Sequence, residues 1–257
     1  MNRIAEAFRH GEKIFIPYIA CGDPDIETTK NLVREMVKNG AGIVELGIPF
    51  SDPTAEGPVI QQASLRALTG GITTDKIFAM VKELREDVKI PLVFMTYANV
   101  VFSYGTEKFL SQCEALGIDG LILPDVPFEE REDFAPACDA HGIALISMIA
   151  PTSEQRIAAI SRNAKGFIYI VSSLGVTGVR SEITTDIAGM VRAIRANSDT
   201  PCAVGFGIST PEQAKNMADY ADGVIVGSAI VKIIAQYGRD CVKPVGEFVK
   251  AMKEAIS

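Results

Sequence analysis

The sequence predicts a single-domain (β/α)8 TIM barrel, and three observations support this fold class. Eight short apolar runs lie along the 257 residues, and each is followed by a stretch with helical periodicity. The runs are continuous in Ile, Val, Leu and Phe, as is typical of parallel strands covered on both faces. Eight strand–helix units in a chain of about 250 residues match the usual size of this barrel.

The first four runs span residues 14–20, 42–47, 91–97 and 120–125. A long loop is expected between the second run and its helix, and the helix after the fourth run has mixed polarity. The other three predicted helices repeat apolar residues at spacings of three and four: Leu32, Val33, Met36 and Val37; Ile77, Met80, Val81 and Leu84; Phe109, Leu110, Cys113 and Leu116.

The remaining runs span residues 143–150, 166–172, 201–207 and 223–228. The helix after the seventh run is expected to begin at Thr210-Pro211, where a capping-box spacing coincides with Pro at the first helical position. An extra helical turn is predicted at the C-terminus, near residues 244–256. An additional N-terminal helix, over about residues 2–11, could close the bottom of the barrel with Ile4 and Phe8 pointing inward.

A doubly wound open sheet is the alternative fold. It usually has fewer strands and often a Gly-rich first turn, but residues 21–25, CGDPD, contain no such pattern. No linker or low-complexity segment divides the chain, so residues 1–257 are expected to form one domain.

Composition excludes several classes of function. The net charge of −7 and the lack of a basic cluster argue against nucleic-acid binding. A small anionic substrate remains possible, because backbone N–H groups bind phosphate without net positive charge. The polar N-terminus and the lack of an apolar run of about 20 residues indicate a soluble, cytoplasmic protein. Five scattered cysteines without a CxxC pair favour reduced thiols over a metal site.

Active sites of such barrels lie at the C-terminal ends of the strands. Glu45 is unusual there, because an acid stands between Val44 and Leu46 in an apolar run. If it points inward, burial raises its pKa, which suits a general acid/base. A structural salt bridge is the alternative. Other polar residues near these ends are Asp23, Asp52, Glu56, Tyr97, Asn99, Asp125 and Tyr169; Asp23 fits a turn, and Asp125 a structural or interface role.

Glycine-containing segments follow the last three runs, at residues 172–180, 205–210 and 226–230. Small residues expose backbone N–H groups, and a helix that begins there adds a positive partial charge. Gly178, Gly207, Gly227 and Ser228 are therefore candidate phosphate ligands. The alternative is that these glycines only form tight turns.

The segment ELGIPFSDPTAEGPVIQ, residues 45–61, resembles the signature of the tryptophan synthase alpha chain family. The likeness covers nearly the whole chain, with further matching segments in the family's order: PYIACGDPD, MTYANVVFSYG, ILPDVPFEE, SSLGVTGVR, GFGISTPEQ and GSAIVKII. The resemblance implies a lyase that cleaves indole-3-glycerol phosphate to indole and glyceraldehyde 3-phosphate, without cofactor or metal. It also implies a heterotetramer with a pyridoxal-phosphate beta chain, which receives the indole through a tunnel.

The same resemblance assigns roles to residues. Glu45 matches the general acid/base, and Glu56 stands where the family has its second carboxylate, an Asp. The remaining matches are Tyr169 beside the substrate; Thr177 and Gly178 in the loop after the sixth strand; Phe206, Gly207, Gly227 and Ser228 around the phosphate; Tyr18, Met95 and Ile122 in the indole pocket; and Pro49 and Asp52 facing the beta chain.

Two positions depart from the family pattern: Glu56 is one methylene longer than Asp, and Thr54 replaces the usual Leu. Catalytic groups tolerate little misplacement, so these changes leave two alternatives to the partner-dependent lyase. One is a catalytically impaired subunit that acts mainly as an allosteric activator of the beta chain. The other is a stand-alone lyase that releases indole without a partner.

Overall fold

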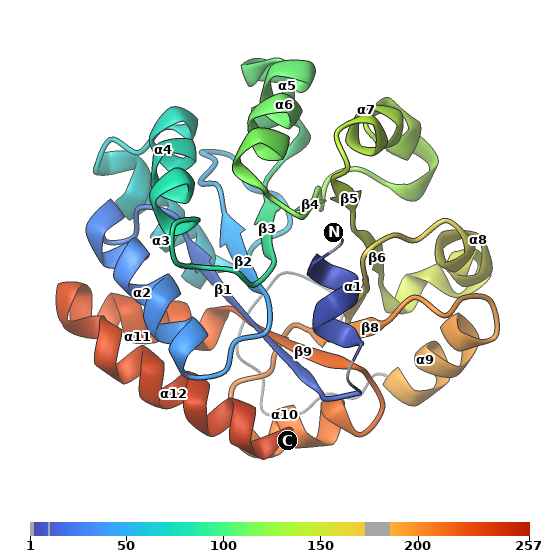
Figure 1. Cartoon of the computed structure of the whole chain (residues 1–257). Coiled ribbons are helices and arrows are strands. Elements are labelled where there is room, and N and C mark those ends of the chain that lie inside the picture. Colours follow the sequence, from blue (N-terminus) through green and yellow to red (C-terminus); the bar gives the residue numbers. More distant parts are fainter. Residues whose placement is uncertain (1–2, 10, 173–185) are drawn as a thin grey trace.

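The computed structural model describes residues 3–9, 11–172 and 186–257, and it confirms the barrel (Figure 1). In this part of the chain, nine parallel strands form one sheet in the order β5-β4-β3-β2-β1-β9-β8-β7-β6. Helices surround the sheet on its outer side (Figure 1). The strands are β1 Ile14–Ala20, β2 Val44–Gly47, β3 Leu92–Met95, β4 Gly120–Ile122, β5 Ala144–Leu145, β6 Ser147–Ile149, β7 Ile168–Val171, β8 Cys202–Gly205 and β9 Gly223–Val226.

The fifth predicted strand closes the ring. It contains both β5 and β6, which are separated by Ile146 alone. β5 pairs with β4, whereas β6 pairs with β7. The Ile146 N–H still donates to the Leu121 carbonyl at 2.9 Å, and the pairing then changes sides at Ser147. One continuous segment therefore joins the two ends of the sheet, and the eight predicted runs account for all nine strands.

The helical elements include two that the sequence interpretation missed. The loop expected after the second strand contains α3, and α5 precedes the predicted third helix. The elements are α1 Arg3–Phe8, α2 Ile26–Lys38, α3 Pro58–Thr69, α4 Thr74–Leu84, α5 Ala98–Tyr104, α6 Thr106–Leu116, η1 Phe128–Asp133, α7 Ala135–Ala140, η2 Pro151–Arg156, α8 Ile157–Arg162, α9 Ile187–Arg195, α10 Pro211–Ala218, α11 Ser228–Tyr237, η3 Gly238–Cys241 and α12 Val242–Ala255.

The continuous apolar runs are explained by two separate cores. In β1, Ile16 and Tyr18 belong to the core inside the barrel, whereas Phe15 and Ile19 pack in the layer under the helices. Adjacent strand residues point to opposite faces, so both faces must be apolar when both are covered. This arrangement leaves the ends of the barrel as the places where polar groups can gather.

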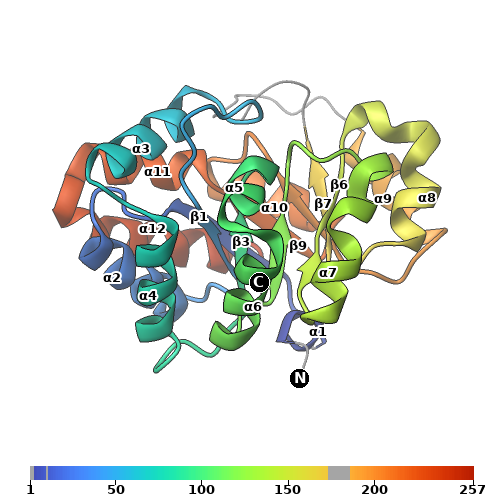
Figure 2. The same cartoon turned by 90° about the horizontal axis from the view of Figure 1, so that it is seen from above.

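The N-terminal helix α1 closes the bottom of the barrel, as the sequence predicted. Ile4 is fully buried in the inner core, and the Phe8 ring lies 6.1 Å from that of Phe167. Figure 2 shows α1 at the end of the barrel opposite the C-terminal ends of the strands. The inner core is thus sealed at one end, and a substrate can enter from the other.

An aspartate at the start of β4 connects several elements at the barrel bottom. The Asp119 carboxylate accepts the Leu92 N–H at 3.0 Å and an Arg85 N–H at 2.8 Å. The Asp119 N–H donates to the Leu92 carbonyl, and its own carbonyl accepts the N–H of Ala144. Arg3 of α1 adds a second ion pair to the same carboxylate at 2.8 Å. We call this arrangement of an aspartate, an arginine and two strand starts a strand-start clasp.

The same clasp occurs again at the start of β9. The Asp222 carboxylate accepts the Cys202 N–H at 2.8 Å and an Arg195 N–H at 3.0 Å. The Asp222 N–H donates to the Cys202 carbonyl, and its own carbonyl accepts the N–H of Ile14. Each arginine lies seven residues before the strand-start residue whose N–H the aspartate binds. The two clasps therefore match in their hydrogen bonds and in the spacing from the arginine to the strand start.

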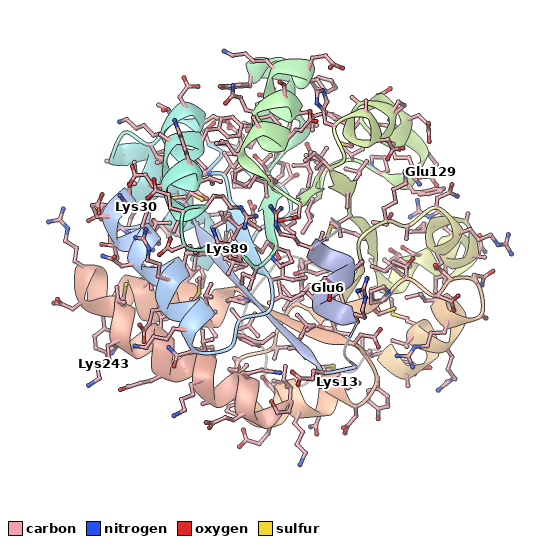
Figure 3. All side chains as sticks on the ribbon, in the orientation of Figure 1. Glu6, Lys13, Lys30, Lys89, Glu129 and Lys243 are labelled. Atoms are coloured by element: carbon pink, nitrogen blue, oxygen red, sulfur yellow. The ribbon has the colours of Figure 1, made fainter. Side chains whose placement is uncertain are left out.

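Charged side chains project from the outer helices in mixed signs, as Lys243 and Glu129 illustrate (Figure 3). Each of these two is paired with an opposite charge, Lys243 with Glu247 and Glu129 with Arg156. Of the helices formed by the described residues, none is long and apolar enough to cross a bilayer.

Candidate active site

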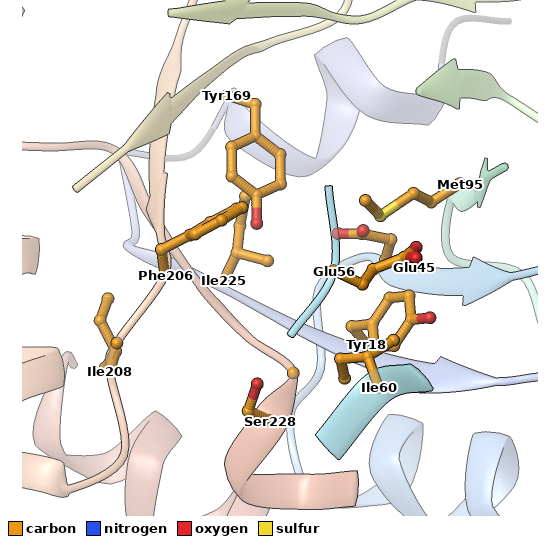
Figure 4. Close-up of a pocket in the computed structure, with 12 residues that line it drawn as sticks. Tyr18, Glu45, Glu56, Ile60, Met95, Tyr169, Phe206, Ile208, Ile225 and Ser228 are labelled. Atoms are coloured by element: carbon orange, nitrogen blue, oxygen red, sulfur yellow. The ribbon is translucent and has the colours of Figure 1, made fainter. Parts of the chain in front are cut away.

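A pocket with about 470 Å³ of space between its lining residues, part of it open to solvent, lies at the C-terminal ends of the strands (Figure 4). Both acidic side chains, Glu45 and Glu56, lie on one side of it, and Tyr169 and Phe206 face them from the other (Figure 4). Most of the site residues expected from the sequence meet here. The wall consists of Tyr18, Glu45, Glu56, Ile60, Met95, Tyr169, Phe206, Gly207, Ile208, Ile225, Gly227 and Ser228.

Glu45 is the most deeply buried acid of the pocket. It is the second residue of β2, pairs in register with Tyr18 and is 1% exposed. Its Oε2 atom has no hydrogen-bond partner among the described residues. Burial, assisted by the Glu56 carboxylate, raises the pKa of Glu45 to about 8. The group is therefore mainly protonated at neutral pH and can donate a proton to a ligand in the pocket.

Glu56 has a different environment, although it is also buried. The Tyr97 hydroxyl donates to Glu56 Oε2 at 2.7 Å, and the Gln61 side-chain amide donates to the Glu56 carbonyl at 2.8 Å. Burial raises the pKa of Glu56, and the charge of Asp125 adds to this, whereas the hydrogen bond from Tyr97 lowers it. Burial thus raises the pKa of both acids, but a hydrogen bond opposes this effect at Glu56 and none does so at Glu45 among the described contacts.

Two tyrosines form opposite walls, and glycines make room for them. A Cβ atom at Gly47 would lie 2.2 Å from the Tyr18 hydroxyl, and one at Gly205 would lie 2.4 Å from the Tyr169 hydroxyl. Burial and the nearby carboxylates raise the pKa of both phenols, so both stay neutral. These glycines serve the shape of the pocket and were not singled out from the sequence for this reason.

The phosphate-binding candidates other than Gly178 line the same pocket. Helix α11 begins at Ser228, its N-cap is Gly227, and no side chain caps it. The first N–H groups of a helix have no partner within it, and the helix dipole places positive charge there. Gly207 lines the same pocket with a φ of 77°, a conformation that glycine adopts readily. These features suit a phosphate or another small anion.

Phe206 is held in an unusual backbone conformation. Its φ of 75° lies in the left-handed region, which non-glycine residues rarely adopt. The Ser172 hydroxyl donates to its carbonyl, and its ring packs edge-on against Tyr169, with centroids 6.1 Å apart. Such strain concentrates at functional sites, and here it turns the ring toward the pocket.

Some predicted site residues lie elsewhere. Ile122 is fully buried in the inner core and is not part of the pocket wall that the structure describes. Asp52 is exposed on the loop before α3 and accepts a hydrogen bond from Ser51, whereas Pro49 is buried within the chain. Thr177 and Gly178 lie outside the described residues.

The other two rim aspartates have structural partners. Both Asp125 oxygens accept the Ala98 N–H at the start of α5, as the expected structural role requires. Asp23 does more than form a turn, because its buried carboxylate makes a two-point ion pair with Arg66 at 2.8 Å. This pair attaches α3 to the segment after β1.

The sequence interpretation missed four contributors to the site. Ile60, Ile208 and Ile225 are apolar wall residues, and their sequence context does not distinguish them from other core residues. Tyr97 was noted at a strand end but received no role. Its pairing with Glu56 spans 41 residues, so no local pattern could reveal it.

Taken together, fold and pocket define a TIM-barrel enzyme whose pocket is lined by two buried acids and by the uncapped start of a helix. The chain belongs to the tryptophan synthase alpha chain family, whose model matches residues 4–257. It is 46% identical to the tryptophan synthase alpha chain of Lacticaseibacillus casei over 256 residues, which cover 100% of this chain and 96% of that protein. It is 49% identical to that of Lactiplantibacillus plantarum over 257 residues, covering 100% and 97%.

Solved structures agree with this membership. The crystal structure of the tryptophan synthase alpha chain from Legionella pneumophila is 37% identical, with a TM-score of 0.89 and coverage of 100% of this chain and 97% of that one. A chain from the tryptophan synthase α2β2 complex of Pyrococcus furiosus is 36% identical, with a TM-score of 0.86 and coverage of 94% and 97%. The fold and the family therefore match over nearly the full length.

Proposed function

We propose that this protein is a lyase that cleaves indole-3-glycerol phosphate to indole and D-glyceraldehyde 3-phosphate, as the alpha subunit of tryptophan synthase in L-tryptophan biosynthesis. The observation that carries the proposal is the Glu45 carboxyl group. It is 1% exposed, it has an unpartnered oxygen among the described residues, and its pKa of about 8 keeps it protonated at neutral pH. A proton donor of this kind is what the first step of a retro-aldol cleavage requires.

The proton transfers can be followed on these residues. Glu45 donates its proton to the indole ring carbon that bears the glycerol chain, and positive charge develops at the ring N–H. The Glu56 carboxylate stabilises this N–H. Glu45, now ionised, accepts the proton of the adjacent glycerol hydroxyl. The C–C bond then breaks, its electron pair returns to the ring, and the products are indole and the aldehyde. Glu45 ends protonated, so no co-reactant is consumed.

The phosphate group of the substrate is placed at the start of α11. Gly227 and Ser228 present backbone N–H groups there, and Gly207 lies on the same wall. Met95, Tyr18 and Tyr169 supply apolar and aromatic surface for the indole ring. The substrate would then bridge the two ends of the pocket, with its reacting carbon near the acids.

The proposed partner is a tryptophan synthase beta chain in an α2β2 heterotetramer, acting in the cytoplasm. Support comes from the related Pyrococcus furiosus chain, which was solved within an α2β2 complex. Asp52 is exposed on the loop that leads from β2 to Glu56, where a partner could contact both the surface and the site. The proposed contact would connect the partner to the second acid through only three intervening residues.

The test is an indole-release assay on indole-3-glycerol phosphate with and without a beta chain. We expect release that rises when the beta chain is added, and no release from Glu45→Gln. Binding of inorganic phosphate, measured by calorimetry, is expected to persist in that variant. Glu247→Gln, at an exposed glutamate on α12, is the matched control and should behave as the wild type. Full activity of Glu45→Gln would refute the assignment.

A further inference from the structure

We propose that Tyr97 is a positioning residue for the reaction, which holds Glu56 in place and keeps its carboxylate available to the ring N–H. This inference rests on the proposed function and concerns a residue outside the acid–base pair itself. Tyr97 stands at the N-cap of α5, after β3, and is 2% exposed. It acts on the substrate only through Glu56.

The phenol oxygen of Tyr97 makes two hydrogen bonds to the same short segment. It donates to Glu56 Oε2 at 2.7 Å, and it accepts the Ala55 N–H at 2.9 Å. One oxygen atom therefore fixes both the backbone just before Glu56 and the end of its side chain. A neutral hydroxyl is suited to this double role, because it can donate and accept at once.

The Tyr97 ring is itself held firmly. It packs against Phe50 with ring centroids 5.2 Å apart, and Phe50 belongs to the loop that leads to Glu56. The next residue, Ala98, donates its N–H to the Asp125 carboxylate at 3.1 Å. The phenol is thus supported on both sides, and the position of Glu56 follows from that of the ring.

The length of the side chain at position 56 gives this contact its importance. Glutamate has one more rotatable bond than aspartate, so an unsupported carboxylate would occupy several positions. A hydrogen bond from a fixed phenol selects one of them. Small errors in the placement of a catalytic group cost large factors in rate, so the reaction depends on this selection.

The charge of Asp125, beyond β4, opposes the ionisation of Glu56. Glu45 on β2 and the Tyr18 phenol on β1 are the other titratable groups nearby, and raised pKa values keep both of them neutral while Glu56 ionises. Against burial and the charge of Asp125, the Tyr97 hydroxyl is the described contact that favours the charged form. Removal of the hydroxyl is therefore expected to raise the pKa of Glu56.

The first experiment is a ¹³C NMR titration of glutamate carboxyls in the whole protein, with Glu45→Gln and Glu56→Gln used for assignment. In the wild type we expect Glu56 to titrate at lower pH than Glu45. In Tyr97→Phe we expect the pKa of Glu56 to rise by about one unit, which is a tenfold loss of the ionised fraction at pH values below that pKa. This measurement needs no turnover, so it remains valid if the proposed reaction is not observed.

The second experiment is the pH profile of indole release. For Tyr97→Phe we expect the acidic limb of the kcat profile to move to higher pH by about one unit, so that kcat falls about tenfold on that limb. We expect KM to change less than twofold, since the phosphate end of the pocket is untouched. In the Glu56→Gln background, Tyr97→Phe is expected to have little further effect on kcat, because it acts through Glu56.

Tyr104→Phe is the matched control. Tyr104 ends the same helix, and its hydroxyl also donates to a carboxylate, that of Asp75, at 2.6 Å. The Tyr104→Phe variant loses the same kind of hydrogen bond, but Tyr104 does not contact the pocket wall. The pH profile of this variant should therefore match that of the wild type. The proposal fails if Glu56 titrates at or above Glu45 in the wild type, if Tyr97→Phe leaves the pKa of Glu56 unchanged, or if the two Tyr→Phe variants behave alike. Absence of indole release in the wild type, with the expected NMR shifts, would instead refute the proposed function.

Discussion

Replacing Glu45 by Gln is expected to stabilise the fold at alkaline pH while it removes the catalytic acid. The pKa of Glu45 is about 8 in the folded chain, against an ordinary value of 4.5. The folded state therefore holds its proton more tightly than the unfolded state. Below pH 4.5 the carboxyl is neutral in both states, and its contribution to the free energy of unfolding is complete. As pH rises the unfolded state ionises first, so this contribution declines, and it is fully lost above pH 8.

The size of this effect follows from the pKa difference. One pKa unit corresponds to about 1.4 kcal/mol, so a rise of about 3.5 units costs about 5 kcal/mol above pH 8 and about 3 kcal/mol at pH 7. At 1% exposure, solvent screens little of this cost. Glutamine has nearly the same shape and no charge to bury, so Glu45→Gln escapes the cost.

The assay is urea unfolding of both proteins from pH 5 to pH 9. The chain has no tryptophan, so far-UV circular dichroism is the suitable signal. The stability difference in favour of Glu45→Gln should grow from pH 5 to about pH 8 and then level off, whereas Glu247→Gln should follow the wild type throughout. A difference between Glu45→Gln and wild type that is constant across this range would refute the reasoning that burial raises the pKa.

Four further outcomes are expected. Glu56→Asp should lower the kcat of indole release about tenfold, because the shorter side chain loses its phenol contact; a large rise in rate would instead identify the native chain as a catalytically impaired subunit. Gly205→Ala should displace the Tyr169 ring and destabilise the fold by about 1–3 kcal/mol, seen as a lower urea midpoint; an unchanged midpoint would show that the pocket wall yields freely. Asp119→Asn should cost about 3 kcal/mol in unfolding free energy, because it leaves two arginines without their buried partner. Asp222→Asn should cost less, since that pair is more exposed, and the reverse order would contradict this view.

The strands could be predicted because their burial is simple. Seven of the nine described strands are buried throughout, and β5 and β6 are partly buried, so the strands appear as apolar runs. Helix α3 was missed because its buried face is formed largely by small residues, Ala63, Ser64 and Ala67, which give a weak periodic signal. Helix α5 was missed because its first N–H is bound by Asp125, 27 residues away, and local capping residues are absent.

Site residues could be predicted where the type of residue differs from that of its neighbours in the sequence. Glu45 stands out as an acid in an apolar strand, and the glycines of the last two loops stand out by composition. Phe206 could be placed near the phosphate only from the family resemblance, because its left-handed backbone is set by contacts with Ser172 and Tyr169. The contact between Tyr97 and Glu56 depends on how two separate loops pack against each other. It could not be predicted from the spacing of residues within either loop.

The two strand-start clasps have a consequence for how the barrel is assembled. One is contained within residues 85–144 and the other, apart from its bond to Ile14, within residues 195–222. They lie on strand pairs β3/β4 and β8/β9, which are four strand–helix units apart in a ring of eight. Each clasp therefore occupies the equivalent position in one half of the barrel. The residues of each Asp–Arg pair are separated by a short stretch of chain. Each pair can therefore form early in folding and hold the strands of its own half together before the ring is complete. A circularly permuted chain opened at the exposed Gly142 would keep both Asp–Arg pairs on unbroken segments and, within the clasps, would separate in sequence only the Asp119 carbonyl from the Ala144 N–H that it accepts.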